Sequence, residues 1–143
     1  MPLTLAIAQA IVRDGLAYAR KAGFRPLTVV VLDARAAVVA SASEDGSSLS
    51  RFDVAKGKAH GALAFNVGSR KLGEMAIERP HFLAGASGAI STGGIVPVAG
   101  GVLIKDADGI IIGAVGVSGD NSDNDEAAAV AGVAAAGLTA DGG

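Results

Sequence analysis

The chain contains no cysteine and no tryptophan, and its 143 residues include only four phenylalanines and one tyrosine. Without thiols it can form no disulfide, thiolate metal site or cysteine nucleophile. Half of the residues are hydrophobic but few of these are aromatic, so the core must be built from Ala, Val, Leu and Ile. The 12 basic and 14 acidic side chains give a net charge of −2, without a basic stripe. This balance, with so few aromatic rings to stack on bases, argues against nucleic-acid binding.

Long apolar runs are also missing. No stretch approaches the roughly 20 residues that are needed to span a bilayer, and the N-terminus lacks the cationic start of a signal peptide. We therefore expect a cytoplasmic protein without a membrane segment, formed by one domain over residues 1–143. Each of the 21 glycines costs backbone entropy on folding. We expect burial between subunits of a homo-oligomer to offset that deficit.

Hydrophobic periodicity predicts four helices and four clear strands. Thr4 caps the first helix, which ends at Gly23. Ser50 begins a second helix, and Ser69 caps a short third one. The final helix begins at Ser122 or Asp123. The expected elements are helices over 4–23, 50–63, 69–76 and 122–138, and strands over 27–32, 36–40, 102–104 and 110–117. Residues 78–94 are interpreted as a loop with one further short strand, and residues 141–143 as a frayed tail.

The segment from Val98 to Glu126 is the most informative part of the chain. Two apolar runs flank Lys105-Asp106-Ala107-Asp108-Gly109, which is typical of a hairpin turn. Gly113 and Gly116 in the second run allow another element to approach closely, and we expect the final helix to do so. The element order is α-β-β-α-α-β-β-β-α. It predicts an α/β (α+β) fold with a single antiparallel five-stranded sheet and helices packed on it.

Three motifs of this chain resemble the GlcG/HbpS family of small haem- or ligand-binding proteins, which includes the C-terminal domain of PduO. They are Asp45-Gly46-Ser47 followed by Ala55-x-x-Lys58-Ala59-x-x-Ala62; Val98-Ala99-Gly100-Gly101-Val102 followed by Asp108-Gly109; and Ile112-Gly113-Ala114-Val115-Gly116-Val117-Ser118-Gly119 followed by Asp125-Glu126. The chain departs from the family at three positions. Leu103 stands where the family usually has Pro, Gly61 where it often has Thr, and Asn124 where it commonly has Gln.

The resemblance implies a profilin-like or PAS-like sandwich and a homo-oligomer, from dimers up to octamers. It does not imply one activity. Members are described as haem binders, as corrinoid-linked domains and as accessory proteins of glycolate or aromatic catabolism. Haem is therefore the one cofactor that the resemblance suggests, and no metal site is expected.

Several residues are candidates for binding a small acid or haem near a subunit interface. Arg51 and Lys58 near the start of the second helix suit a carboxylate or a haem propionate, and Lys58 lies in a family motif. Of the two imidazoles, His81 is favoured over His60, because an arginine and an aromatic residue lie beside it. Backbone close to the ligand is expected at Thr92-Gly93 and Gly100-Gly101.

Two other functions stay open. In a small cofactor-independent enzyme that acts on a hydroxy acid, an oxo acid or an aromatic catabolite, His81 or Glu78 is the general base, and Arg51 or Lys58 is the electrophile. The third possibility is an assembly partner without a ligand. The acidic turn at residues 120–126 resembles an anion cradle or a calcium loop. Its own negative charge disfavours the first, and the missing downstream ligands disfavour the second.

Overall fold

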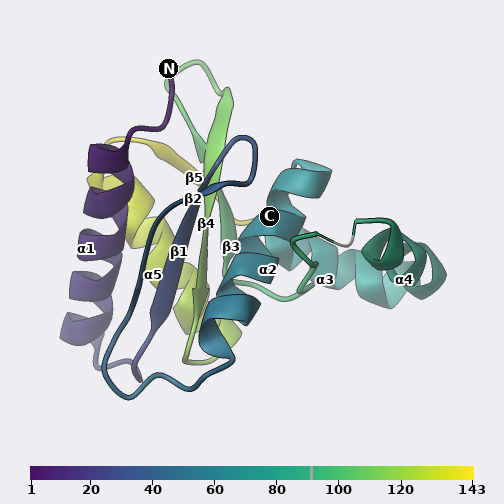
Figure 1. Cartoon of the computed structure of the whole chain (residues 1–143), viewed down its shortest axis with the longest axis horizontal. Helices are drawn as coiled ribbons and strands as arrows, with labels where there is room; N and C mark the ends of the chain where they lie inside the picture. Colours follow the sequence, from purple (N-terminus) through teal and green to yellow (C-terminus); the bar gives the residue numbers. More distant parts are fainter. Residues whose placement is uncertain (91) are drawn as a thin grey trace.

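The computed structural model describes residues 1–90 and 92–143, and over these residues the chain forms five helices and one five-stranded antiparallel sheet (Figure 1). The strands are ordered β2-β1-β4-β3-β5 across the sheet. In chain order the elements are α1 (Leu5–Ala22), β1 (Thr28–Asp33), β2 (Val38–Ser43), α2 (Arg51–Phe65), α3 (Ser69–Glu78), α4 (Pro80–Ala89), β3 (Gly101–Lys105), β4 (Ile111–Ser118), α5 (Ser122–Ala135) and β5 (Thr139–Asp141). The predicted fold class and the five-stranded sheet are confirmed.

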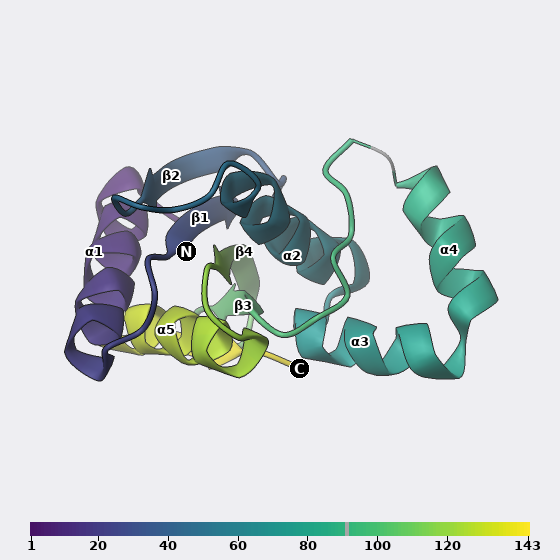
Figure 2. The ribbon, with the colours of Figure 1, turned by 90° about the horizontal axis from the view of Figure 1, so that it is seen from below.

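The sheet lies between two helical layers, with α1 and α5 on one face and α2 on the other (Figure 2). Successive side chains of a strand point to opposite faces. Val29 and Val31 of β1 therefore pack with α1 and α5, whereas Val30 and Leu32 pack against α2. Both faces of the central strands are covered, which explains their nearly unbroken apolar runs. Among the described residues, no helix combines the length and the hydropathy needed to cross a membrane.

Gly116 of β4 faces α2, so our prediction that it contacts the final helix is wrong. A β-carbon added at Gly116 would overlap the carbonyl oxygen of Ala55. The alternation of the strand decides the side, because Val115 and Val117 already point toward α1 and α5. Helix α5 makes its own close approach to α1, where a β-carbon at Gly132 would lie 2.5 Å from the carbonyl oxygen of Ile11.

Residues 78–94 contain a helix, so the predicted loop with one short strand is wrong there. Pro80 disfavours a helical conformation at the residue before it, so α3 ends at Glu78 and Arg79 leaves the helical region, with φ −137° and ψ 61°. Proline is also well suited to the first turn of a helix, so α4 begins at Pro80 itself. Helices α3 and α4 together project from the sandwich as an arm (Figures 1 and 2). Residue 91 of this stretch lies outside the described residues.

The fifth strand is at the C-terminus, so the predicted order and the predicted frayed tail are corrected together. β5 pairs with β3, with Leu103 opposite Asp141. Lys105 Nζ donates to Asp141 Oδ2 over 2.7 Å, and Arg70 N donates to Gly142 O over 3.3 Å. These contacts hold the tail against the open edge of β3. The final helix begins at Ser122, as predicted, but it ends at Ala135, three residues before the predicted end.

Candidate functional site

The residues predicted to bind a ligand fall into two groups on different sides of α2. Arg51 and Lys58 lie toward β4 and α5, where their side chains bond to Ser118 and Asp125. His60 lies toward residues 92–100, a segment without helix or strand that we call the strap. The strap leads from the end of the arm back to β3 and passes between α2 and α4 (Figure 2).

Lys58 is almost fully buried, with 2% of its surface exposed. Its ammonium donates to the Val117 carbonyl over 2.9 Å and to Asp125 Oδ2 over 3.1 Å. The other oxygen of Asp125 accepts from Asp120 N over 2.9 Å. This pair joins α2, β4 and α5 inside the fold. A ligand carboxylate would have to displace Asp125 to reach the ammonium, so the predicted role of Lys58 stays a prediction that this geometry disfavours.

Burial dominates the ionisation of this pair. It lowers the pKa of Lys58 below the usual lysine value, although the nearby Asp125 carboxylate acts in the opposite direction. Burial likewise raises the pKa of Asp125, against the hydrogen bond from the Asp120 amide and the attraction of Lys58. For each group, the free-energy cost of removing its charged form from water is larger than the stabilisation of that form by its partner. Such a pair is costly to break at one end only.

Gly100 and Gly101, where backbone close to a ligand was predicted, also lie beside Lys58, and they allow chain segments to approach one another closely. A β-carbon at Gly100 would lie 2.7 Å from Lys58 Nζ, and one at Gly101 would overlap the Lys58 carbonyl. Both glycines are therefore needed where α2 meets the start of β3. Arg51 is half-buried and donates from Nη1 to Ser118 Oγ over 3.3 Å. The geometry of this group fits a structural joint.

The acidic turn after β4 is occupied by contacts within the chain. Asp120 accepts from the backbone of Arg25 and of Asn121, each over 2.7 Å. The carboxylates of Asp123 and Glu126 pair with Arg70. Within residues 1–90 and 92–143, no three His, Cys, Asp or Glu side chains are grouped so as to hold a metal ion. The calcium-loop alternative is thereby disfavoured.

Replacing Asp120 with asparagine is expected to destabilise the protein at neutral pH and to have little effect in strong acid. Amide donors, first that of Arg25, lower the pKa of Asp120 to about 2 from its ordinary 3.8. Since the folded pKa lies below the unfolded one, the stabilisation is complete above about pH 4 and is lost as the pH falls toward 2.

We expect Asp120→Asn to lower the free energy of unfolding by about 1–2 kcal/mol at pH 7, the order expected for hydrogen bonds to a charged group. Urea unfolding followed at several pH values between 2 and 7 measures this difference. Asp108→Asn, at the exposed hairpin turn, is the matched control. A difference that does not shrink below pH 3 would show that the carboxylate charge is not the cause.

The strap is held on α2 and α3 by contacts at glycines and by three hydrogen bonds. Val96 N donates to Gly57 O over 3.3 Å, and His60 Nδ1 donates to Gly94 O over 2.8 Å. Ser69 was predicted to cap α3, but Gly68 holds that position. The Ser69 hydroxyl instead donates to the Val98 carbonyl over 2.6 Å and accepts from Gly101 N over 2.7 Å. The described strap residues are thus fixed in place relative to α2.

The arm places a cation and aromatic rings beside the C-terminal end of α2. The guanidinium of Arg79 lies 4.3 Å from the centre of the Phe82 ring. That ring meets Phe65 of α2 edge-on, with centroids 6.1 Å apart. His81 and Glu78 are exposed on either side of Arg79. Arg79, His81 and Phe82 lie within four residues of one another in the chain, but no sequence pattern brings Phe65 against them.

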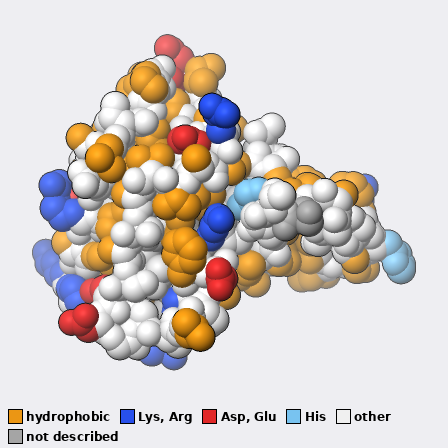
Figure 3. Space-filling model, in the orientation of Figure 1, with side chains coloured by type: hydrophobic (Ala, Val, Ile, Leu, Met, Phe, Trp, Pro, Cys, Tyr) orange, Lys and Arg blue, Asp and Glu red, His pale blue; other side chains and the backbone are white. Residues whose placement is uncertain are grey.

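Much of the arm surface is apolar. Figure 3 shows hydrophobic side chains along both edges of the projecting part. Ile77 of α3 is 84% exposed and Phe82 of α4 is 41% exposed. Thr92 is exposed and Gly93 half-buried at the start of the strap. The arm therefore presents unburied apolar surface next to Arg79.

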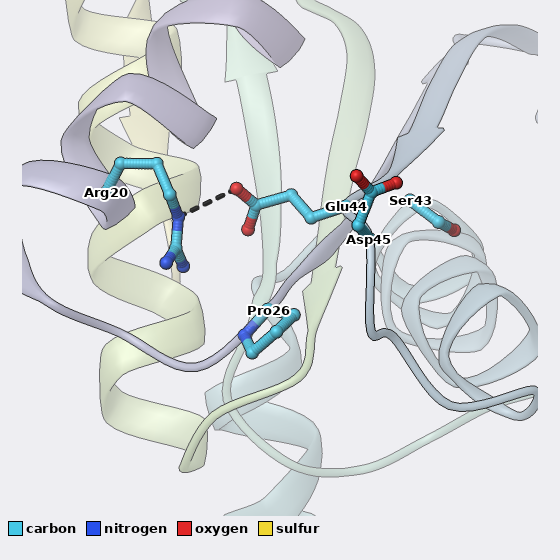
Figure 4. Close-up of a pocket in the computed structure, with 5 residues that line it drawn as sticks. All are labelled: Arg20, Pro26, Ser43, Glu44 and Asp45. Carbon is cyan, nitrogen blue, oxygen red and sulfur yellow. Dashed lines mark ion pairs between the residues drawn. The ribbon is translucent and has the colours of Figure 1, made fainter.

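A separate pocket of about 460 Å³ lies at the end of β2, lined by Arg20, Pro26, Ser43, Glu44 and Asp45 (Figure 4). Arg20 and Glu44 point toward each other there, with Nε and Oε2 2.7 Å apart. The second oxygen of Glu44 accepts from Leu27 N over 2.9 Å. The principal charged groups of this pocket already bind one another, and it contains none of the predicted site residues.

A family model matches residues 3–134 of the chain, and it is described as "Haem degrading protein HbpS-like". The chain belongs to the HbpS-like family. This membership confirms the resemblance drawn from the motifs between Asp45 and Glu126. A comparison with curated protein sequences finds no match.

Solved structures of this family have the same fold. The crystal structure of HbpS is 28% identical, with a TM-score of 0.81, and the match covers 94% of this chain and 90% of that one. A double mutant of Streptomyces reticuli HbpS is 29% identical, with a TM-score of 0.81 and coverage of 94% and 87%. The PduOC–haem complex is 24% identical, with a TM-score of 0.84 and coverage of 96% and 97%. At that identity, PduOC supports the fold alone.

Proposed function

We propose that this chain binds haem beside α2, the strap and α4, in a site that a second copy of the chain helps to enclose. Its membership of a family described as haem-degrading HbpS-like proteins is the observation that carries the proposal. The structurally similar PduOC was crystallised as a complex with haem, which adds support from a protein of the same fold.

The residues beside the strap fit the chemistry of haem. A bound haem would supply an iron centre, and an imidazole or a similar donor would hold it. His60 and His81 are the two imidazoles of the chain. Arg79 offers a guanidinium for a propionate, and Phe65 and Phe82 offer apolar rings. The first group, around Lys58, is buried and paired, which favours the strap side.

The exposed arm supports the involvement of a second copy. Haem is a large apolar ring that needs walls on both faces, and the chain has few aromatic side chains to provide them. Ile77 and Phe82 are exposed on the arm, and exposed apolar patches commonly mark interaction sites. We therefore expect haem to be retained on a dimer or a larger assembly rather than on a monomer.

Titration of the purified protein with haemin tests the function. We expect a saturable complex whose Soret band differs from that of free haemin, and a native mass spectrum with haem on an assembly of two or more subunits. Unchanged haemin absorbance would contradict haem binding. Haem bound to a single subunit would contradict the shared site.

Arg79→Ala is expected to weaken haemin binding about tenfold, since losing one charge-assisted contact of about 1.5 kcal/mol changes an equilibrium constant by that factor. The affinity is measured by the same absorbance titration. Arg35→Ala, at the exposed tip of the β1–β2 hairpin, is the control and should bind like the wild type. Equal affinities for the two variants would remove Arg79 from the site.

A further inference from the structure

We infer that His60, and not the more exposed His81, ligates the haem iron through Nε2. This inference rests on the proposed function and adds the identity of the iron ligand. The sequence favoured His81 because of its neighbours Arg79 and Phe82 in the chain. The structure favours His60 for two reasons. Its Nε2 is available to ligate iron, and the orientation of its ring is fixed by the strap.

The hydrogen bond of His60 determines which nitrogen carries the proton. Nδ1 lies 2.8 Å from the carbonyl oxygen of Gly94. A carbonyl oxygen only accepts, so Nδ1 is the protonated nitrogen, and in the neutral ring Nε2 has the free lone pair. Nε2 has no hydrogen-bond partner among the described residues. Histidines that bind metals commonly donate their other N–H to a carbonyl or a carboxylate, which fixes the ring and raises the basicity of the ligating nitrogen.

The strap also holds the plane of the ring. A β-carbon added at Gly93 would overlap Cγ, Cδ2 and Nε2 of His60 at nearly equal distances. A point equally close to these three atoms lies over the face of the ring rather than beyond its edge. The backbone at Gly93 therefore packs on one face of the imidazole. The Nε2 lone pair lies in the plane of the ring, so Gly93 does not cover it.

The position of the strap is itself fixed, so the ring is oriented before any ligand binds. A β-carbon at Gly57 would lie 2.7 Å from Val96 Cγ2, and one at Gly61 would lie 3.2 Å from Ile95 Cγ2. His60 is half-buried between these glycines on α2. By contrast, His81 is exposed near the start of α4, and no hydrogen bond holds its ring among the described residues. A ligand held at one angle binds iron with less loss of side-chain entropy than a free one.

Haemin complexes of the wild type, His60→Gly and His81→Gly test the inference. Resonance Raman and electron paramagnetic resonance spectra report imidazole ligation directly. We expect the wild type and His81→Gly to have the same histidine-ligated spectrum and His60→Gly to lose it. Added free imidazole should restore that spectrum in His60→Gly. Loss of the spectrum in His81→Gly with retention in His60→Gly would overturn the inference and leave haem binding intact. A wild type that binds no haemin would overturn the proposed function, and the inference with it.

Two further measurements keep the test decisive if His60→Gly does not fold. In the haem-free wild type, long-range ¹H–¹⁵N correlation spectra should show the Nδ1–H tautomer of His60, and the Nε2–H tautomer would contradict the inference. Gly93→Ala should displace the ring and weaken haemin binding about tenfold or more. Gly85→Ala, where an added β-carbon meets nothing within 4 Å, is its control. Wild-type affinity and spectrum in Gly93→Ala would also overturn the inference.

Discussion

Lys58→Met is expected to lower the free energy of unfolding by about 3–5 kcal/mol, the usual cost of removing one partner from a buried ion pair. The substitution leaves Asp125 buried, and it leaves the Val117 carbonyl without the donor that now lies 2.9 Å away. Methionine fills most of the volume of the lysine stem, so the loss reports the charge rather than a cavity. Urea unfolding monitored by circular dichroism measures it, and a loss below about 1 kcal/mol would contradict this account.

Two further variants separate burial from charge. Lys71→Met removes a lysine from an exposed pair with Glu74, and exposed pairs contribute about 0–1 kcal/mol. Lys58→Met combined with Asp125→Leu removes both charges. The double variant should be more stable than Lys58→Met alone, but it should not fully regain wild-type stability, because Asp120 N then loses its acceptor. Additive losses would show that the two charges do not interact.

Gly116→Ala is expected to destabilise the protein by more than about 3 kcal/mol, or to prevent folding. Overpacking a core costs about 1–3 kcal/mol even when side chains can yield. Here the added methyl group would overlap a backbone oxygen of α2, that of Ala55, which cannot move without shifting the whole helix away from the sheet. Urea unfolding, or soluble yield if the variant is too unstable, gives the result.

The matched control is Gly88→Ala in α4, where an added β-carbon meets nothing within 4 Å. Alanine is the better helix former, so this variant should be as stable as the wild type or more stable by up to about 1 kcal/mol. Equal stability of Gly116→Ala and Gly88→Ala would show that α2 can move away from β4, and the close packing described above would then be wrong.

The parts of the fold that follow local rules could be predicted from the sequence. The Thr4 cap, the left-handed Gly23 and the turn at Asp106–Gly109 depend on residues within a few positions of one another. β5 could not be predicted this way, because three residues become a strand only through the edge of β3, far away in the chain. Helix α4 was not predicted because Pro80 and the six small residues over 84–89 were interpreted as a loop, although proline suits the start of a helix.

The candidate site shows the same limit. Sequence motifs identified Lys58, Gly100 and Gly101 as important, but they could not show that these residues serve the joint between α2, β3 and α5. The pairing of His60 with Gly94 was equally hidden, since 34 positions separate the two residues in the chain. A hydrogen bond across that distance depends on the route of the strap. That route is set by Gly57 and Gly61 of α2 and by Gly73 of α3, where an added β-carbon would lie 2.9 Å from the Pro97 carbonyl oxygen, and these glycines form no recognisable sequence pattern.

The hydroxyl of Ser69 has a consequence for how this fold can vary. It lies where the chain leaves the sandwich for the arm, and it binds Val98 and Gly101 where the chain returns. The segment formed by the arm and the strap is thus closed at its base by the hydrogen bonds of Ser69. Lengthening such a loop costs little free energy, because the closure entropy grows only with the logarithm of its length. Insertions or deletions within the arm can therefore reshape its exposed surface in a relative without changing the register of β3.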